Sequence, residues 1–368
     1  MTQIEWTHLP GFKGASWNPI VGCSVVSPGC TNCYAMKQVG RILRMTDGQS
    51  HYAGTVADSK AGPVWTGKVA RASDKAFTAP LRRRIPTCYF VNSMGDLFAE
   101  SVPDEWIDQV FAVMALSAQH RFIVLTKRPE RMRDYLIRQF DRCDGEDGIV
   151  DDLIAVAELA GVDWREAVDA WPLPNVWLGV SVEDQARAAE RIPLLLDTPA
   201  AVRFISAEPL LGFITLTDFD IAHAHGVDCH DALSGCYLEQ NGNQHFQHVG
   251  GAKLDWVICG GESGPDARPM HPDWARFLRD QCADAGVPYF FKQWGEWSPV
   301  WDKKQGDQCP PCVVCQDGEV LTGRHMITGT MDEQDAEILR RIGKRAAGHL
   351  LDGVEHFNWP ADPAGSAA

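Results

Sequence analysis

The chain lacks any run of eighteen or more apolar residues, which is the length that a membrane-spanning helix requires. Its first residues, MTQIEWTHLPGFKG, also lack the basic start and the apolar stretch of a secretory signal peptide. Because these absences argue against the membrane and exported classes, we expect a cytoplasmic protein with no membrane partner.

Positive charge is scarce as well. The chain has 34 lysines and arginines against 49 aspartates and glutamates, so its formal net charge is -15 at pH 7. This balance argues against a broad surface for polyanions, although it is compatible with a local basic cleft.

Cysteine, by contrast, is plentiful, with 12 residues in the chain. In a reducing compartment these cysteines are not expected to form a disulfide framework. We therefore interpret close cysteine clusters as metal sites and scattered cysteines as small core residues.

Short β-branched and aromatic runs, each ending in polar residues and followed by a helical stretch, recur along the 368 residues. This alternation predicts an α/β fold with a parallel sheet, and so many units predict a complete or partial (β/α) barrel of six to seven strands. The clearest runs are TCYFV (87–91), RFIVL (121–125), NVWLGV (175–180), AVRFI (201–205), DWVIC (255–259) and VPYFF (287–291).

Two stretches interrupt this rhythm. Residues 141–172 are acidic and helical in pattern, and residues 216–253 are rich in Gly, His, Asn and Gln, as in an irregular loop. We expect a barrel domain over residues 1–300 with these two insertions, and a C-terminal extension with a cysteine-rich loop over 301–368.

Three cysteines, Cys23, Cys30 and Cys33, lie within GCSVVSPGCTNC, where the stretch ASWNPIVGC is expected to run from the first strand into a loop. A closed zinc site uses four ligands. A four-iron cluster held by three thiolates keeps one iron open for a chelating ligand, which suits a cluster that takes part in chemistry. The count of three therefore indicates a reactive centre at the mouth of the barrel.

A three-cysteine loop after the first strand of a β/α barrel resembles the radical S-adenosylmethionine superfamily. Tyr34, directly after the third cysteine, resembles the spore photoproduct lyase branch. The first two cysteines are separated by six residues, whereas the superfamily's usual pattern has three.

Most of the chain is also similar to a phage-encoded protein family associated with this three-cysteine motif. The shared blocks are WNPIVGC, CTNCYA, VNSMGDLF, LTKRPERM, WLGVSVED, ISAEPLLG, ICGGESG, FFKQWGEW and RIGKRAAGHLLDG.

This resemblance implies that Cys23, Cys30 and Cys33 bind a [4Fe-4S] cluster while S-adenosylmethionine occupies the fourth iron. One electron from the reduced cluster would then release a 5'-deoxyadenosyl radical. An electron donor such as flavodoxin is an implied partner, and a phage origin implies the host cytoplasm.

Polar side chains and glycines follow successive strands, where a barrel gathers its functional groups. Helix caps and turns are the structural alternative for each of them. The predicted cofactor-binding residues are Ser93, Asp96, Lys127, Arg128, Ser181, Glu183, Glu208, Gly260 and Gly261.

Residue type suggests a role for most of these positions. Lys127 or Arg128 would pair with the methionyl carboxylate. Ser93 and Asp96 would meet the amino group. Ser181 and Glu183 would form hydrogen bonds with the ribose hydroxyls. Gly260 and Gly261 would let the backbone approach the adenine or the substrate.

A second set of cysteines, Cys309, Cys312 and Cys315, forms the compact stretch CPPCVVC. Its spacing could supply three ligands to an auxiliary iron-sulfur cluster, or to zinc with His325 or a distant cysteine as the fourth ligand. A reduced surface loop is the alternative.

The cysteine patterns and the resemblance together leave three functions open. The first is a radical enzyme that rearranges or modifies a hypermodified thymine of phage DNA, or its nucleotide precursor. The second is a photoproduct repair lyase. The third is a module in which metal sites only stabilise the fold and nucleic acid or a protein is the ligand.

Overall fold

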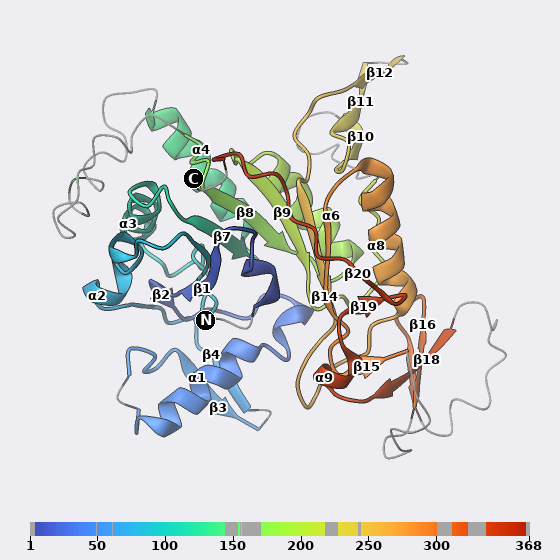
Figure 1. Ribbon diagram of the computed structural model, residues 1–368, viewed down its shortest axis with the longest axis horizontal. Coiled ribbons are helices and arrows are strands. Elements are labelled where there is room, and N and C mark those ends of the chain that lie inside the picture. Colours follow the sequence, from blue (N-terminus) through green and yellow to red (C-terminus); the bar gives the residue numbers. More distant parts are fainter. Residues whose placement is uncertain are drawn as a thin grey trace. The chain divides into compact units, whose positions relative to one another are not determined.

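A computed structural model describes most of the chain. The described residues are 4–48, 50–60, 62–143, 154, 156, 171–217, 227–241, 244–299, 311–322 and 336–365. They form two compact units, drawn in Figure 1. Unit 1 consists of Met1–Val180, Leu194–Arg203 and Ala361–Ala368, and unit 2 consists of Ser181–Pro193 and Phe204–Pro360.

A seven-stranded parallel sheet is the main element of the fold, with the order β1-β6-β7-β8-β9-β13-β14. This open order confirms the predicted α/β class, as a partial barrel of seven parallel strands. All six predicted runs are strands of this sheet, and β1 is the seventh. The strands are β1 (Lys13–Trp17), β6 (Thr87–Val91), β7 (Arg121–Thr126), β8 (Val176–Ser181), β9 (Val202–Ala207), β13 (Trp256–Gly260) and β14 (Tyr289–Gln293).

Helices follow the strands of the sheet, and local sequence signals set their ends. Helix α8 begins after His271, whose Nδ1 accepts a hydrogen bond from the Asp273 N–H at 3.1 Å. It ends at Gly286, which adopts the left-handed conformation (φ 68°) that favours glycine at a helix C-terminus. The longer helices are α1 (Tyr34–Met45), α3 (Asp104–Ala115), α4 (Pro129–Cys143), α6 (Gln185–Leu196) and α8 (Pro272–Ala285).

The remaining elements are short. In unit 1 they are η1 (Glu5–Thr7), β2 (Ile20–Val21), η2 (Pro28–Cys30), β3 (Val56–Ser59), β4 (Gly62–Trp65), β5 (Ala70–Arg71), α2 (Asp74–Phe77) and η3 (Pro80–Arg82). In unit 2 they are β10 (Val227–Asp231), β11 (Cys236–Asn241), β12 (Gln244–His248), β15 (Trp297–Ser298), β16 (Cys312–Cys315), β17 (Val320–Thr322), β18 (Ala336–Arg341), α9 (Lys344–Ala347), β19 (Leu350–Leu351) and β20 (Val354–Glu355).

The two predicted insertions have different outcomes. Most of residues 141–172 lie outside the described part of the chain. The described part of 216–253 is not an irregular loop, because β10, β11 and β12 form a three-stranded antiparallel sheet.

The predicted division at residue 301 falls within unit 2 of the structure. Strand β15, which precedes this point, pairs with β18, which follows it, in the four-stranded sheet β15-β18-β16-β17. These hydrogen bonds join the two sides of the predicted boundary within unit 2. Among the helices that the structure describes, none combines the length and the apolar character needed to cross a membrane.

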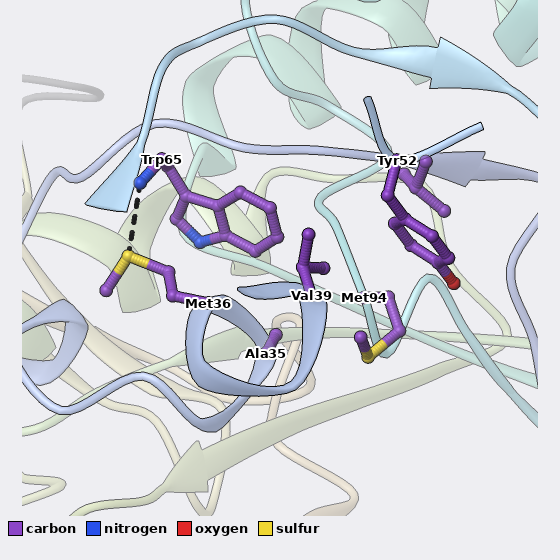
Figure 2. Close-up of a cluster of buried hydrophobic side chains, with 7 residues drawn as sticks. Ala35, Met36, Val39, Tyr52, Trp65 and Met94 are labelled. Atoms are coloured by element: carbon purple, nitrogen blue, oxygen red, sulfur yellow. Dashed lines mark hydrogen bonds between the residues drawn. The ribbon is translucent and has the colours of Figure 1, made fainter. Parts of the chain in front are cut away.

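Helix α1 packs against the β3–β4 hairpin in unit 1, as the blue segment of Figure 1 shows. Its buried face carries Ala35, Met36 and Val39, which point toward Trp65 and other apolar side chains in Figure 2. The Trp65 N–H also donates a hydrogen bond to the Met36 Sδ at 3.3 Å. This cluster anchors the helix that follows the three cysteines, and Cys23 and Cys33 pack against it.

The α1 cluster predicts a contrast between two methionines of the same helix. Met36 is 4% exposed and Met45 is 75% exposed. We expect Met36→Ala to lower the free energy of unfolding by about 2–5 kcal/mol, because it removes buried apolar atoms and leaves a cavity. Met45→Ala is the control and should change it by less than about 0.5 kcal/mol. Urea unfolding measures both, and equal effects would contradict the packing in Figure 2.

Candidate metal and cofactor site

The three cysteines lie on one loop between β2 and α1 in unit 1. Cys23 follows β2, Cys30 ends the turn η2, and Cys33 is the residue before α1. Two consecutive turns shape the loop, since the Cys30 N–H donates to the Ser27 carbonyl at 2.9 Å and the Cys33 N–H to the Cys30 carbonyl at 3.3 Å. Short local hydrogen bonds therefore bring the second and third thiols to the start of the helix.

The start of this loop is held by close backbone contacts. Gly22 has φ 97°, and a Cβ there would lie 2.2 Å from the Lys68 carbonyl oxygen. Its N–H donates to the Met94 carbonyl at 3.1 Å. A Cβ on Gly95 would lie 2.9 Å from the Gly22 oxygen. The block NSMGD after β6 thus lies directly against the backbone that leads into Cys23.

The three thiols differ in their electrostatic surroundings. Burial and the charge of Asp96 together raise the pKa of Cys23 to about 12, although Arg128 opposes both. Burial also raises the pKa of Cys33. The pKa of Cys30 is lowered, because hydrogen bonds from the loop backbone and the charge of Lys127 outweigh its burial.

Arg128, the second residue after β7, contacts the start of the cysteine loop at Cys23 and Ser24. Its NH1 group donates to the Cys23 Sγ at 3.2 Å and to Asp96 Oδ2 at 3.0 Å. Its Nε donates to Glu100 Oε1 at 3.3 Å, and its NH2 group donates to the Ser24 carbonyl oxygen at 2.9 Å and to the Ser24 hydroxyl. A guanidinium has five N–H donors, so protein acceptors account for all of them.

The Asp96 carboxylate is equally occupied. Oδ1 accepts from the Phe98 N–H at 3.0 Å and from the Thr126 hydroxyl at 2.7 Å. Oδ2 accepts from the Lys127 N–H at 3.0 Å and from Arg128. The side chains of Asp96 and Arg128 are each 6% exposed. Their contacts place both residues in a buried network that holds the loop, while a direct contact of either residue with a cofactor stays a prediction.

The predicted residue Ser93 is joined to the loop by other hydrogen bonds. Its hydroxyl donates to Asn18 Oδ1 at 3.1 Å, and the Met94 N–H donates to the same oxygen at 2.9 Å. The Ser93 carbonyl accepts from the Tyr34 hydroxyl at 2.6 Å. Asn18, in the block WNP, is a positioning residue that the sequence reasoning missed, although it lies within a shared motif.

The donor set of unit 1 fits an anionic iron-sulfur cluster. It offers three thiols, with one cation bonded to Cys23 and the charge of another acting on Cys30. Among the described residues, no group of three or more His, Cys, Asp or Glu side chains is arranged to hold a single metal ion. In a four-iron cluster each cysteine binds a different iron, so the thiols lie farther apart than the ligands of one ion.

The remaining predicted residues lie in unit 2. Glu183 is 0% exposed, and its carboxylate pairs with Arg191 at 3.4 Å, whose side chain is 1% exposed. Arg191 also donates to the Ser181 carbonyl at 2.7 Å, and the Ser181 hydroxyl donates to the Glu208 carbonyl at 3.5 Å. The sequence reasoning missed Arg191, which lies in a helix whose pattern resembles a solvated face. The side chains of Ser181 and Glu183 thus both contact protein groups.

Glu208 has a different setting, at the carboxyl ends of β9, β13 and β14. Its Oε1 pairs with the Lys292 Nζ at 2.8 Å, and its Oε2 accepts from the Ser206 hydroxyl at 3.1 Å. The Glu208 and Lys292 side chains are 14% and 20% exposed. A Cβ on Gly260 would lie 2.9 Å from Glu208 Oε1. Lys292 lies within β14, directly after the predicted run VPYFF, so its position was a signal that the sequence contained.

Gly261 is required by packing. A Cβ there would lie 2.0 Å from the Trp294 carbonyl oxygen, and the Gly261 N–H donates to the Gln293 carbonyl at 2.9 Å. Its missing side chain therefore accommodates the protein's own backbone, which is the structural alternative to cofactor contact.

The predicted second metal site is only partly covered by the described residues, so it stays a prediction. Cys309 lies outside them, as does His325. Cys312 and Cys315 are the two ends of strand β16, which pairs with β17 and β18. Residues three apart in a strand point to opposite faces of the sheet. Cys312 is fully buried, and burial raises its pKa to about 11.

The network around Arg128 predicts unequal effects for its two acidic partners. Asp96→Asn would place an amide nitrogen where an oxygen now accepts hydrogen bonds, and would weaken the pairing of a buried charge. We expect a loss of about 3–5 kcal/mol in the free energy of unfolding. Glu100 is 64% exposed, so Glu100→Gln is the matched control and should cost less than about 1 kcal/mol. Urea unfolding that gives equal costs would refute the network.

Comparison with known proteins places the chain in a family. No curated protein and no solved structure matches it. Residues 1–360 match the sequence model of a family described as "Protein of unknown function (DUF5131)". The match includes the thiol loop, the Asp96–Arg128 network and the Glu208–Lys292 pair. The chain therefore belongs to the DUF5131 family.

Proposed function

We propose that the protein is a radical S-adenosylmethionine enzyme whose [4Fe-4S] cluster is bound by Cys23, Cys30 and Cys33. The observation that carries this proposal is the loop itself, with three thiols and with Arg128 donating to the first of them at 3.2 Å. When bound, such a cluster with an open iron supplies one electron that cleaves S-adenosylmethionine to a 5'-deoxyadenosyl radical. An electron donor of the flavodoxin kind completes the reaction.

We assign different roles to the neighbouring cations Lys127 and Arg128, on the basis of the contacts in unit 1. Arg128 has its donors on protein acceptors, so we assign it to positioning Cys23 and to balancing the charge of the thiolate. Lys127, whose charge acts on Cys30, is then the residue that we assign to the methionyl carboxylate. The Ser93 hydroxyl and nearby carbonyls are suited to the methionyl amino group.

In unit 2, Glu208 and Lys292 are the groups best suited to polar atoms of the cofactor or the substrate. Their side chains are partly exposed, whereas Glu183 is fully buried. We therefore propose that Glu208 binds the ligand. Lys292 pairs with its carboxylate, and Gly260, which has no side chain, lies close beside it. We assign Glu183 and Arg191 to holding the end of β8.

For the substrate we propose a thymine base that already carries a side chain, in phage DNA or in a nucleotide. Hydrogen abstraction reaches unactivated carbon atoms that acid-base chemistry cannot attack, which suits rearrangement of such a side chain. This part of the proposal depends on the resemblance to the phage-encoded family and to radical enzymes.

Iron content and cofactor cleavage test the proposal together. Protein purified and reconstituted under anaerobic conditions should bind about four irons at this loop and form 5'-deoxyadenosine after reduction. Cys30→Ala should lose the iron and the cleavage activity while remaining folded by circular dichroism.

Cys315→Ser, in strand β16, is the matched control and should keep both iron and cleavage. Wild-type cleavage by Cys30→Ala would eliminate the proposed function. Iron or zinc loss in the Cys315 variant would instead assign a metal to the second set of cysteines.

A further inference from the structure

Every charged residue on the exposed face of α1 is a lysine or an arginine. Lys37, Arg41 and Arg44 are spaced by four and three residues, which places them on one side of a helix. The opposite side is the apolar cluster in Figure 2. The helix contains no acidic residue. We call Lys37, Arg41 and Arg44 the α1 cationic face.

The arginines of α4 offer a comparison, because two of them have acidic partners. On α4, Arg133 pairs with Asp134 at 2.7 Å and Arg138 pairs with Asp104 at 2.9 Å. Arg41 and Arg44 are exposed, and within the described ranges neither has an ion-pair or hydrogen-bond partner. Their charges therefore remain available to an anion from outside the chain.

The surrounding sequence strengthens this local charge. Residues 34–75, which contain α1, β3 and β4, have seven lysines and arginines and three aspartates, although the whole chain has a net charge of -15. An acidic protein that keeps a positive segment next to its candidate cluster concentrates its attraction for polyanions there.

The face also begins at the thiol loop. Tyr34, the first residue of α1, lies three residues before Lys37 on the same side of the helix and is 57% exposed. Its hydroxyl is fixed on the Ser93 carbonyl, which orients the ring. Cations in a row can contact successive phosphates of DNA, and an exposed aromatic ring beside them can stack on a base where the strand is unpaired.

We propose that the α1 cationic face binds the phosphate backbone of DNA, so that the substrate is the polymer and not a free nucleotide. From Lys37 to Arg44 the helix rises about 10 Å, a length over which one DNA strand presents about three phosphates. The guanidinium fork of arginine matches phosphate oxygens. Binding stands on these residues alone, and only the role of DNA as substrate rests on the proposed function.

Salt-dependent binding of a labelled 20-base-pair DNA duplex tests this inference on the full, reconstituted chain. We expect Arg41→Gln/Arg44→Gln to reduce the slope of log K against log salt by about 2 and to weaken binding roughly tenfold per arginine near 0.1 M salt. Arg133→Gln/Arg138→Gln removes the same charge from paired positions and should keep the wild-type slope.

Several results would overturn the inference. These are no binding by the wild type at low salt, an unchanged slope in the α1 variant, or an equal loss in the α4 control. Displacement of DNA by poly-L-glutamate at equal charge concentration would indicate an acidic protein partner. Cleavage of S-adenosylmethionine without DNA should be the same in the α1 variant and the wild type. If the wild type lacks this cleavage, the proposed function fails while DNA binding stands.

Discussion

The buried ion pair between Asp96 and Arg128 is the interaction on which the arrangement of the thiol loop depends. Strands β6 and β7 are parallel neighbours, so the residues that follow them lie close together at their carboxyl ends. Asp96 follows β6 and Arg128 follows β7, and the 3.0 Å contact between them is 6% exposed on each side. From this pair Arg128 reaches Cys23 and Ser24. The sheet thereby sets the position of a loop that has no regular structure of its own at Cys23.

Full use of donors and acceptors explains why this pair is compatible with burial. A buried charge costs free energy unless it is paired and its remaining hydrogen-bonding groups are satisfied. The five donors of Arg128 and the oxygens of Asp96 all have protein partners. These contacts are why we assign Asp96 and Arg128 to holding the loop.

Much of the fold could be predicted from the sequence, because strands that are buried on both faces are continuous apolar runs. The run TCYFV is β6 at the predicted bounds. The pairing of β15 with β18 could not be predicted, since it joins segments that are far apart in the chain. The strand CVVC was also missed. The close spacing of its cysteines suggests a metal-binding loop, whereas its two valines favour a strand, and the sequence alone does not decide between these signals.

The candidate site was predicted as a set of positions, but not as a set of roles. Residue type placed Asp96 and Arg128 at strand ends, where they are. Residue type could not show that Asp96 and Arg128 form an ion pair with each other, because the partners of such side chains depend on the register between the strands. The same limit applies to Glu183, whose partner Arg191 lies on the following helix.

The central claim is that the loop of Cys23, Cys30 and Cys33 binds a cluster with an open iron. Electron paramagnetic resonance of the anaerobically reconstituted and reduced protein tests it most directly. The account predicts about one unpaired spin per chain from a reduced [4Fe-4S] cluster, with a spectrum that changes when S-adenosylmethionine is added. A reduced protein without a cluster signal, or a signal that the cofactor does not alter, would contradict it.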